Sequence, residues 1–266
     1  MRHRLRYAAN CSLLFTELPL LERPAAARAA GFSAMELWWP WPEPEPDPRD
    51  VDALVAAIRE AGVQLVALNL YAGDLASGDS GLLSVPGRTA ELMANLEVVV
   101  GLVQALRISF CNSLYGRRQP GRAEEQDALA AHNLRRVAAA LAPVGGTALL
   151  EPLSGRDGYP LLSIGDAVAV LEQVAAQNCG VLCDLYHLAR LGADAEPDLL
   201  AALPWIRHVQ IADHPGRGEP GSGGLDLDGT LCMLQDAGYD GYVALEYQPA
   251  RSTAESLAWL PRERRG

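Results

Sequence analysis

The feature that most constrains the fold is an apolar segment that recurs along the chain, each time with a carboxylate or amide side chain at or near its end. Eight such segments are present, at 5–10, 34–38, 64–70, 107–112, 147–151, 180–184, 206–211 and 242–246. Each is followed by a segment whose pattern predicts a helix. Eight strand–helix units within 266 residues predict an α/β fold, a (β/α)8 TIM barrel built as a single domain over 1–266.

The connections support this interpretation. An Ala-Gly-apolar junction recurs at 30–32, 61–63 and 237–239, which predicts a helix-ending glycine just before the next strand. The main alternative is an open, doubly wound sheet. The turn after the first predicted strand, Asn-Cys-Ser-Leu-Leu-Phe, has no glycine-rich phosphate loop and disfavours that alternative.

Helix limits also follow from the pattern. We expect the first helix over about 17–30, a single shorter helix after 180–184, and a last helix over about 252–260. Ser163 and Asp166 resemble a capping box that begins the helix after 147–151.

Composition limits the function. The formal net charge is −11, which argues against a nucleic-acid partner because phosphate binding requires a basic face. No segment has 18 uninterrupted apolar residues, and the apolar run near the first residue is too short for a signal peptide, so we expect neither a membrane span nor secretion. The five cysteines form no CxxC pair and favour a reducing compartment, which predicts a cytoplasmic location.

The residues that end the strands are candidates for the chemistry. They are Asn10, Glu36, Asn69, Asn112, Glu151, Asp184, Gln210 and Glu246. Parallel barrel strands place these ends on one face, where barrel enzymes have their sites. Any single Asp or Asn can simply cap the next helix, but Glu and Gln are poor caps. The whole set therefore favours a polar site over a series of caps.

Four of these residues come from four successive strands and offer oxygen ligands to one divalent cation: Glu151, Asp184, Gln210 and Glu246. Without a cation, three converging carboxylates would repel one another and some would take up a proton. Ligation by oxygen alone favours Mg²⁺ or Mn²⁺ as the cofactor. The alternative is a polar cluster that binds no metal.

A substrate anion would need a local cation in so acidic a chain. The loop after 206–211 is rich in Gly and Pro, and Arg217 within it is the best candidate. Arg88, Arg117 and Arg118 are further candidates on the same face, and Asn69 is a candidate for substrate binding at its strand end. His187 follows Asp184 by three residues, so we expect it to lie at this face. Alternatively, the arginines are exposed loop residues that bind no substrate, and His187 has a structural role only.

Seven stretches of sequence carry a resemblance to a known family: AANCSLLF, GFSAMELWWP, NLYAGDLASGDSGLLSVPGR, LLEPLS, CDLYHLAR, HVQIADHPGRGEPGSG and ALEYQP. The chain resembles the hydroxypyruvate isomerase family, within the xylose isomerase-like barrels, over nearly its whole length. The resemblance implies that Glu151 and Glu246 are the acid/base pair, and that Asp184 and Gln210 complete the metal set. It implies that His187 and Arg217 contact the substrate. Ser154 stands where the family usually has Asn, and Gly224 where it usually has an acidic residue.

The implied reaction moves a proton between adjacent carbons of hydroxypyruvate, through an enediolate, to give tartronate semialdehyde. Isomerisation of a longer acid such as 2-oxotetronate, or epimerisation of a ketose, would use the same groups. A zinc-dependent apurinic endonuclease is disfavoured by the five histidines and the acidic charge, and a non-catalytic binding barrel by the two glutamates. Trp38, Trp39 and Trp41 would line either the site or a subunit contact, and a homo-oligomer is possible.

Overall fold

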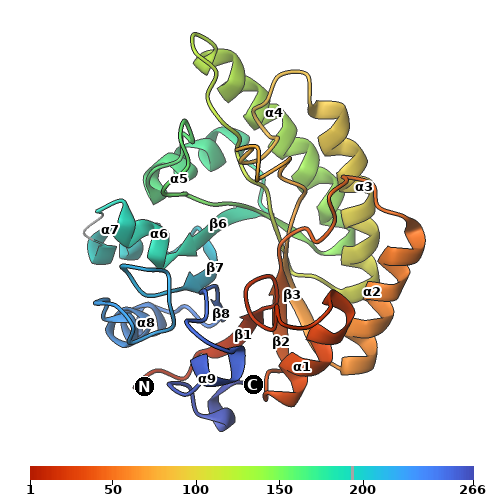
Figure 1. Cartoon of the computed structure of the whole chain (residues 1–266). Helices are drawn as coiled ribbons and strands as arrows, with labels where there is room; N and C mark the ends of the chain where they lie inside the picture. The colour runs from red at the N-terminus through yellow and green to blue at the C-terminus, as the bar shows by residue number, and fades with distance from the viewer. Residues whose placement is uncertain (193–194) are drawn as a thin grey trace.

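The computed structural model describes residues 1–192 and 195–266, and its strands close into one parallel barrel in the order β1 to β8 (Figure 1). The strands are β1 (Arg6–Asn10), β2 (Ala34–Leu37), β3 (Gln64–Asn69), β4 (Phe110–Asn112), β5 (Thr147–Leu150), β6 (Cys179–Asp184), β7 (Ile206–Ile211) and β8 (Tyr242–Leu245). β8 closes the barrel by parallel pairing with β1. The predicted (β/α)8 TIM barrel is confirmed.

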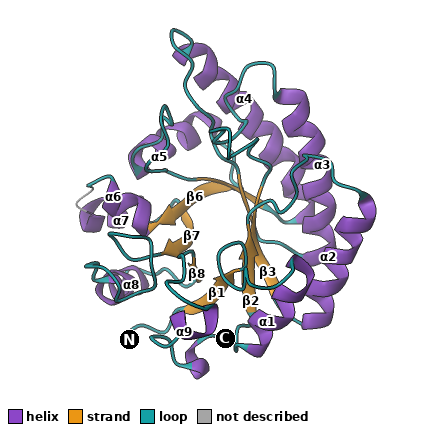
Figure 2. Cartoon of the chain, viewed as in Figure 1, coloured by secondary structure: helices purple, strands orange, loops and turns teal. Residues whose placement is uncertain are grey.

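The helices form a ring outside the strands, as Figure 2 shows. They are α1 (Arg23–Ala29), α2 (Pro48–Ala61), α3 (Thr89–Leu106), α4 (Ala123–Leu141), α5 (Ile164–Val174), α6 (Leu185–Arg190), α7 (Ala195–Ala202), α8 (Leu227–Asp236) and α9 (Thr253–Ser256). Short 3-10 turns lie at η1 (Leu20–Glu22), η2 (Ala142–Val144) and η3 (Arg262–Arg264). The two ends of the chain lie near each other, since Arg264 donates a hydrogen bond to the His3 carbonyl at 2.6 Å (Figure 1).

Local signals explain where the elements begin and end. α2 begins at Asp47, whose carboxylate accepts from the Arg49 N–H, and ends at Gly62 in the left-handed conformation. Gly31 and Gly238 also have positive φ, so the three Ala-Gly-apolar junctions end their helices as predicted. Ser163 caps α5 by accepting from the Asp166 N–H.

Strand alternation determines which side chains face the barrel axis. Tyr7 and Ala9 belong to the main hydrophobic core, whereas Ala8 belongs to a second, smaller cluster of buried residues. The other members of this smaller cluster are Ala34, Val66, Ala67 and Ala244. Because side chains alternate along a strand, the residues two positions after Ala8, Ala34 and Ala244 face the same interior. Those residues are Asn10, Glu36 and Glu246.

Some predicted limits were wrong. In place of one helix over 17–30, η1 and α1 cover 20–29, because Leu18 precedes Pro19 and a residue before proline avoids the helical region. The last helix is α9 alone, which ends at Ser256, four residues before the predicted limit. Two helices, α6 and α7, follow β6 instead of one.

The fourth strand begins at Phe110 instead of residue 107, because Arg107 ends α3 in the left-handed conformation. Glu151 and Glu246 lie one residue beyond the ends of β5 and β8.

α3 is the one described helix that is long and apolar enough to cross a membrane by composition, with a mean hydropathy of 1.3. In the barrel it lies in the outer ring, with Leu92, Val99 and Val103 buried. A core helix of a globular protein meets the same criterion, so α3 is weak evidence for a span.

Candidate active site

Glu36 is the centre of a buried hydrogen-bond network at the carboxyl end of the barrel. One of its carboxylate oxygens accepts from the Asn10 amide at 2.7 Å and from the Gln210 amide at 2.8 Å. The other oxygen lies 2.6 Å from His208 Nε2. All four side chains are at most 2% exposed. Residues from β1, β2 and β7 are therefore joined across the barrel interior.

Glu246 receives two donors, one on each carboxylate oxygen. Asn10 donates to Oε2 at 3.0 Å, and Arg217 donates to Oε1 at 2.5 Å. Burial raises the pKa of the Glu246 carboxyl well above its usual value, although the Arg217 charge opposes this shift. Arg217 lies over the ring of Tyr186, and its guanidinium is 3.6 Å from Asp184 Oδ2.

Glu151 and Asp184 lie beside this pair. Glu151 accepts from the Asn112 amide at 2.7 Å, and Asp184 caps α6 by accepting from the Tyr186 N–H at 2.9 Å. Burial, with a further contribution from the Asp184 charge, raises the pKa of the Glu151 carboxyl to about 8. Several carboxylates in one buried space thus disfavour full ionisation in the absence of a cation.

Two buried oxygens of this cluster have no hydrogen-bond partner among the described residues, Asp184 Oδ2 and Gln210 Oε1. The Gln210 nitrogen is committed to Glu36, so its oxygen must point the other way. Buried polar atoms normally have a hydrogen-bond partner. Two buried oxygens that lack one are suited to bind a cation. Carboxylate and amide oxygens are hard ligands that fit a divalent cation such as Mg²⁺ or Mn²⁺.

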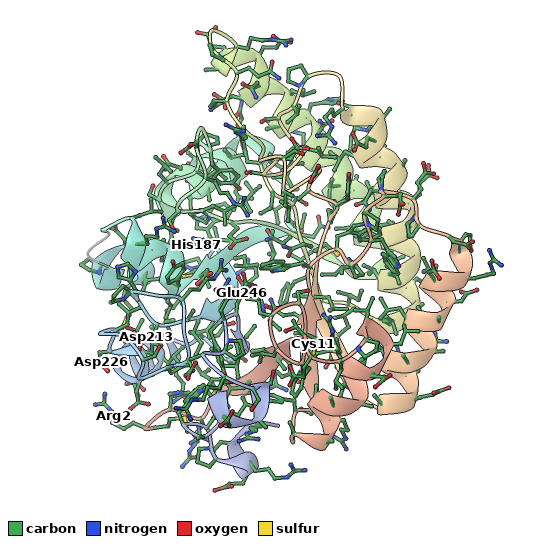
Figure 3. All side chains as sticks on the ribbon, in the orientation of Figure 1. Arg2, Cys11, His187, Asp213, Asp226 and Glu246 are labelled. Atoms are coloured by element: carbon green, nitrogen blue, oxygen red, sulfur yellow. The ribbon has the colours of Figure 1, made fainter. Side chains whose placement is uncertain are left out.

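His187 on α6 brings a ring nitrogen close to two of these carboxylates. Single ligand atoms of Glu151, Asp184 and His187 all lie within 4.8 Å of one another. The His187 Nδ1 atom is 3.0 Å from the Ser154 N–H nitrogen and 2.7 Å from the Ser154 hydroxyl. Burial lowers the pKa of the His187 ring, although the Asp184 charge opposes this effect. Figure 3 labels His187 and Glu246 near the middle of the barrel.

The fully buried carboxylate of Asp213 binds the backbone of the loop that carries Arg217. Asp213 accepts from the backbone N–H groups of His214, Gly221 and Leu225 at 2.8 to 3.0 Å. Burial works against the Asp213 charge, but these backbone donors outweigh it and lower the pKa of the carboxyl. Arg217 itself has a positive φ of 58°. The hydrogen bonds of Asp213 therefore fix the backbone of the loop that carries Arg217.

The other three arginines do not join the cluster. Arg88 pairs with Asp79 and Glu91 at 2.6 Å, and so closes the 71–88 loop on itself. Arg117 donates to the carbonyls of Gly78 and Asp157, and Arg118 to Asp127. The expectation that Arg88 faces the substrate is thus not supported by its place in the fold: nearby carboxylates in its own loop and in α3 hold it.

A cavity of about 790 Å³ opens over the cluster. Glu151, Glu246, His187, Arg217 and Asn69 line it, as predicted, together with Ser154. The tryptophans also line it: Trp38, Trp39 and Trp41. Of the two alternatives predicted for these tryptophans, a position in the site agrees with this lining, and a subunit contact stays a prediction.

Tyr186 was missed by sequence reasoning. It lies in the cavity wall under Arg217, and its place two residues after Asp184 at the start of a helix is the signal that would have indicated it. Glu36 and Asn10 were predicted as strand ends, but their function as partners of Gln210 and Glu246 was not.

These features define a class, that of (β/α)8 enzymes with a buried polyanionic site at the carboxyl ends of the strands. The family model of the xylose isomerase-like TIM barrel matches residues 24–263. The chain belongs to this xylose isomerase-like family.

Individual relatives agree. The chain is similar to a putative hydroxypyruvate isomerase of Streptomyces coelicolor, at 47% identity over 96% of this chain and 95% of that protein. It is similar to a 2-oxo-tetronate isomerase of Cupriavidus necator, at 33% identity over 96% and 97% of the two chains. Among solved structures, one titled AP endonuclease, family 2, from Brucella melitensis matches with a TM-score of 0.89 and 32% identity over 96% and 97% of the two chains. The relatives named isomerases confirm the predicted enzyme class.

Proposed function

We propose that this protein is an isomerase of a small 2-oxo acid, which converts hydroxypyruvate to 2-hydroxy-3-oxopropanoate by proton transfer between adjacent carbons. One observation carries the proposal: two glutamates, Glu151 and Glu246, are buried at the floor of one cavity, each with a donor on its carboxylate. Proton transfer at carbon needs a base that is fixed and shielded from bulk water. The names of the relatives from Streptomyces and Cupriavidus support this reaction class.

We propose Glu151, Asp184, Gln210 and Glu246 as the residues that would hold a divalent cation, with Mg²⁺ or Mn²⁺ as the best fit to an all-oxygen set. Asp184 Oδ2 and Gln210 Oε1, which accept no hydrogen bond from the described residues, support this set. Such a cation supplies Lewis-acid stabilisation of negative charge that develops on the substrate oxygens.

The protein's own residues supply the proton transfer. One glutamate removes the carbon-bound proton and the other, or the same one, returns a proton to the neighbouring carbon. Asn10 and Arg217 hold the Glu246 carboxylate from both sides, and Asn112 holds Glu151. These contacts fix the direction of each carboxylate before the substrate arrives, which reduces the entropic part of the barrier.

Arg217 is the proposed partner of the substrate carboxylate, with His187 and Asn69 as further polar contacts. Arg217 already pairs with Glu246. Its guanidinium has five N–H donors, so it can bind a substrate anion while it keeps this pair. Arg88 is not proposed for this contact, since its partners are Asp79 and Glu91.

Two alternatives follow from the relatives. Isomerisation of 2-oxotetronate would use the same residues and a longer part of the 790 Å³ cavity. An endonuclease with a histidine-rich zinc site is less suited to this chain, because His187 is the one histidine among the described lining residues of the cavity. We further propose a cytoplasmic location, supported by five cysteines that are free in the structure.

The test is proton nuclear magnetic resonance of hydroxypyruvate in D₂O, with the purified protein and added Mg²⁺. We expect the aldehyde isomer to form, with deuterium entering at the carbon that gains a hydrogen. A parallel sample with 2-oxotetronate ranks the two substrates by kcat/KM. Failure to isomerise or to exchange deuterium into either acid, with Mg²⁺ or Mn²⁺ at saturation, would contradict the proposed function.

A further inference from the structure

The contact between His187 and Ser154 determines which ring nitrogen of His187 carries the hydrogen. Ser154 lies just after β5 in the cavity wall, and His187 comes from α6, so the contact joins two neighbouring strand–helix units. Both residues are 5% exposed. The Ser154 backbone nitrogen is 3.0 Å from His187 Nδ1, and the Ser154 hydroxyl oxygen is 2.7 Å from the same atom.

A backbone N–H can donate a hydrogen bond but cannot accept one. The Ser154 N–H therefore requires a lone pair on Nδ1, and the hydroxyl is free to donate to the same nitrogen. In a neutral imidazole the hydrogen then sits on Nε2. The opposite tautomer could donate Nδ1–H to the Ser154 hydroxyl oxygen, but the Ser154 backbone N–H would then face that hydrogen as a buried donor without an acceptor, which is unfavourable.

We propose that Ser154 is a positioning residue that holds His187 as the Nε2–H tautomer, so that Nε2–H donates a hydrogen bond to a substrate oxygen and His187 is not a ligand of the cation. The substrate contact rests on the function proposed above, whereas the exclusion from the metal rests on the contact itself. A histidine bound to a metal through Nε2 needs a free lone pair there and usually donates its other N–H to an acceptor. The Ser154 backbone N–H presents a donor to Nδ1 instead.

This assignment separates two possible ligand sets. Glu151, Asp184 and His187 are close enough to form a mixed carboxylate–histidine site. With Nε2 protonated, His187 presents a hydrogen and no lone pair on the side of the ring that faces the cavity, where Asp184 Oδ2 lies 3.6 Å from Nε2. The neutral oxygen ligand beside the carboxylates is then Gln210, whose Oε1 is unpaired in the described part of the chain.

The first test is spectroscopic and needs no turnover. The protein is labelled with nitrogen-15 histidine, and the ring nitrogen resonances are recorded by nuclear magnetic resonance near neutral pH. The signals of His187 are those that disappear in His187→Gln. We expect the Nε2–H tautomer, with both ring nitrogen shifts changing little on addition of Mg²⁺. An Nδ1–H tautomer, or an Nε2 shift typical of coordination after Mg²⁺ addition, would overturn the proposal.

The second test is calorimetry with Mn²⁺ alone. If the proposal holds, His187→Gln keeps the Mn²⁺ Kd within about threefold of the parent, whereas Asp184→Asn weakens it at least roughly tenfold. Equal loss in both variants would make His187 a ligand and overturn the proposal. Because neither test uses turnover, both can fail or succeed independently of the isomerase activity.

The positioning effect of the Ser154 hydroxyl is tested by Ser154→Ala, with Ser113→Ala as the matched control. Ser113 is also buried, and its hydroxyl has no partner within the described residues. We expect Ser154→Ala to raise KM for the 2-oxo acid roughly fivefold, the effect of one neutral hydrogen bond, and to move the His187 Nδ1 resonance. Ser113→Ala is expected to change neither. A Ser154→Ala variant whose KM and Nδ1 resonance are both those of the parent would overturn the positioning role of the hydroxyl, whereas the role of the backbone N–H is tested by the tautomer measurement above.

Discussion

At the scale of single residues, Glu246 has a donor on each carboxylate oxygen, Arg217 on one and Asn10 on the other. We predict that Glu246→Gln keeps the fold, because the size and shape of the side chain are nearly unchanged. An amide cannot act as a base near neutral pH, so kcat is expected to fall roughly 10²–10⁴-fold. The measurement is turnover at saturating metal, with circular dichroism to check the fold.

Glu151→Gln is expected to behave in the same way. If the two glutamates act as a unit, the double variant should be little slower than either single one. Saturating metal separates lost basicity from lost metal binding. Near-normal turnover of both single variants under those conditions would show that the acid/base assignment is wrong.

Arg217 gives a second prediction at this scale. Its side chain is 19% exposed, and it faces the cavity between Glu246 and Asp184. We predict that Arg217→Ala raises KM for the 2-oxo acid by the equivalent of about 1.5–3 kcal/mol, typical of a hydrogen bond to a charged group. Arg117→Ala is the control, because Arg117 binds backbone carbonyls outside the cavity lining. Equal KM values in the two variants would assign the anion contact to another group.

The sequence could predict the strand-end residues because alternation along a strand fixes which side chains face inward. It could not predict the partners of side chains in long loops. Arg88 illustrates the limit, since its ion pairs with Asp79 and Glu91 depend on how the 71–88 loop folds back on α3. Ser154 was noticed only as a departure from a motif, and its contact with His187 required coordinates.

At the scale of elements, the loop 213–225 positions Arg217 through the buried carboxylate of Asp213. We predict that Asp213→Ala lowers the free energy of unfolding by roughly 2–4 kcal/mol, since three backbone N–H groups lose their acceptor. It should also raise KM, because Arg217 shares the loop. Urea denaturation and steady-state kinetics measure the two effects.

Glu219→Gln is the control for this variant. Glu219 lies in the same loop and accepts one longer hydrogen bond, 3.3 Å from the Ala250 nitrogen. If Asp213→Ala is no less stable than Glu219→Gln, the loop is held by contacts other than the Asp213 carboxylate.

The order and type of the strands were predictable from the recurring apolar segments, but the ends of several helices were not. Periodicity extends a helix through any residues with a suitable pattern, whereas proline restricts the residue before it. This is why the first predicted helix begins only after Pro19, as η1 and α1. The start of β4 was misplaced for a different reason, because a non-glycine residue, Arg107, takes the left-handed conformation.

At the scale of the whole molecule, the buried carboxylates couple folding, metal binding and pH. The Glu151 carboxyl has a pKa raised from 4.5 to about 8, so the metal-free folded state binds more protons than the unfolded state within this window. The contribution of this group to stability therefore falls as pH rises from about 4.5 to about 8.

Since a cation requires the carboxylate form, its binding near pH 7 should release a proton, and its affinity should increase as pH rises from about 6 to about 8. Calorimetry in buffers of different ionisation enthalpy measures the proton release. Thermal unfolding with and without EDTA measures the linked stabilisation, and removal of metal should lower Tm most at the upper end of this range. A metal affinity that does not vary with pH would contradict this coupling.

The most direct test of the central claim is a crystal structure of the protein with Mn²⁺, with the ion located by its anomalous signal. The account predicts one ion with oxygen atoms of Glu151, Asp184, Gln210 and Glu246 at roughly 2.0–2.6 Å, and with His187 Nε2 outside its ligand shell. An ion bound elsewhere, or one bound through His187 in place of Gln210, would contradict the account.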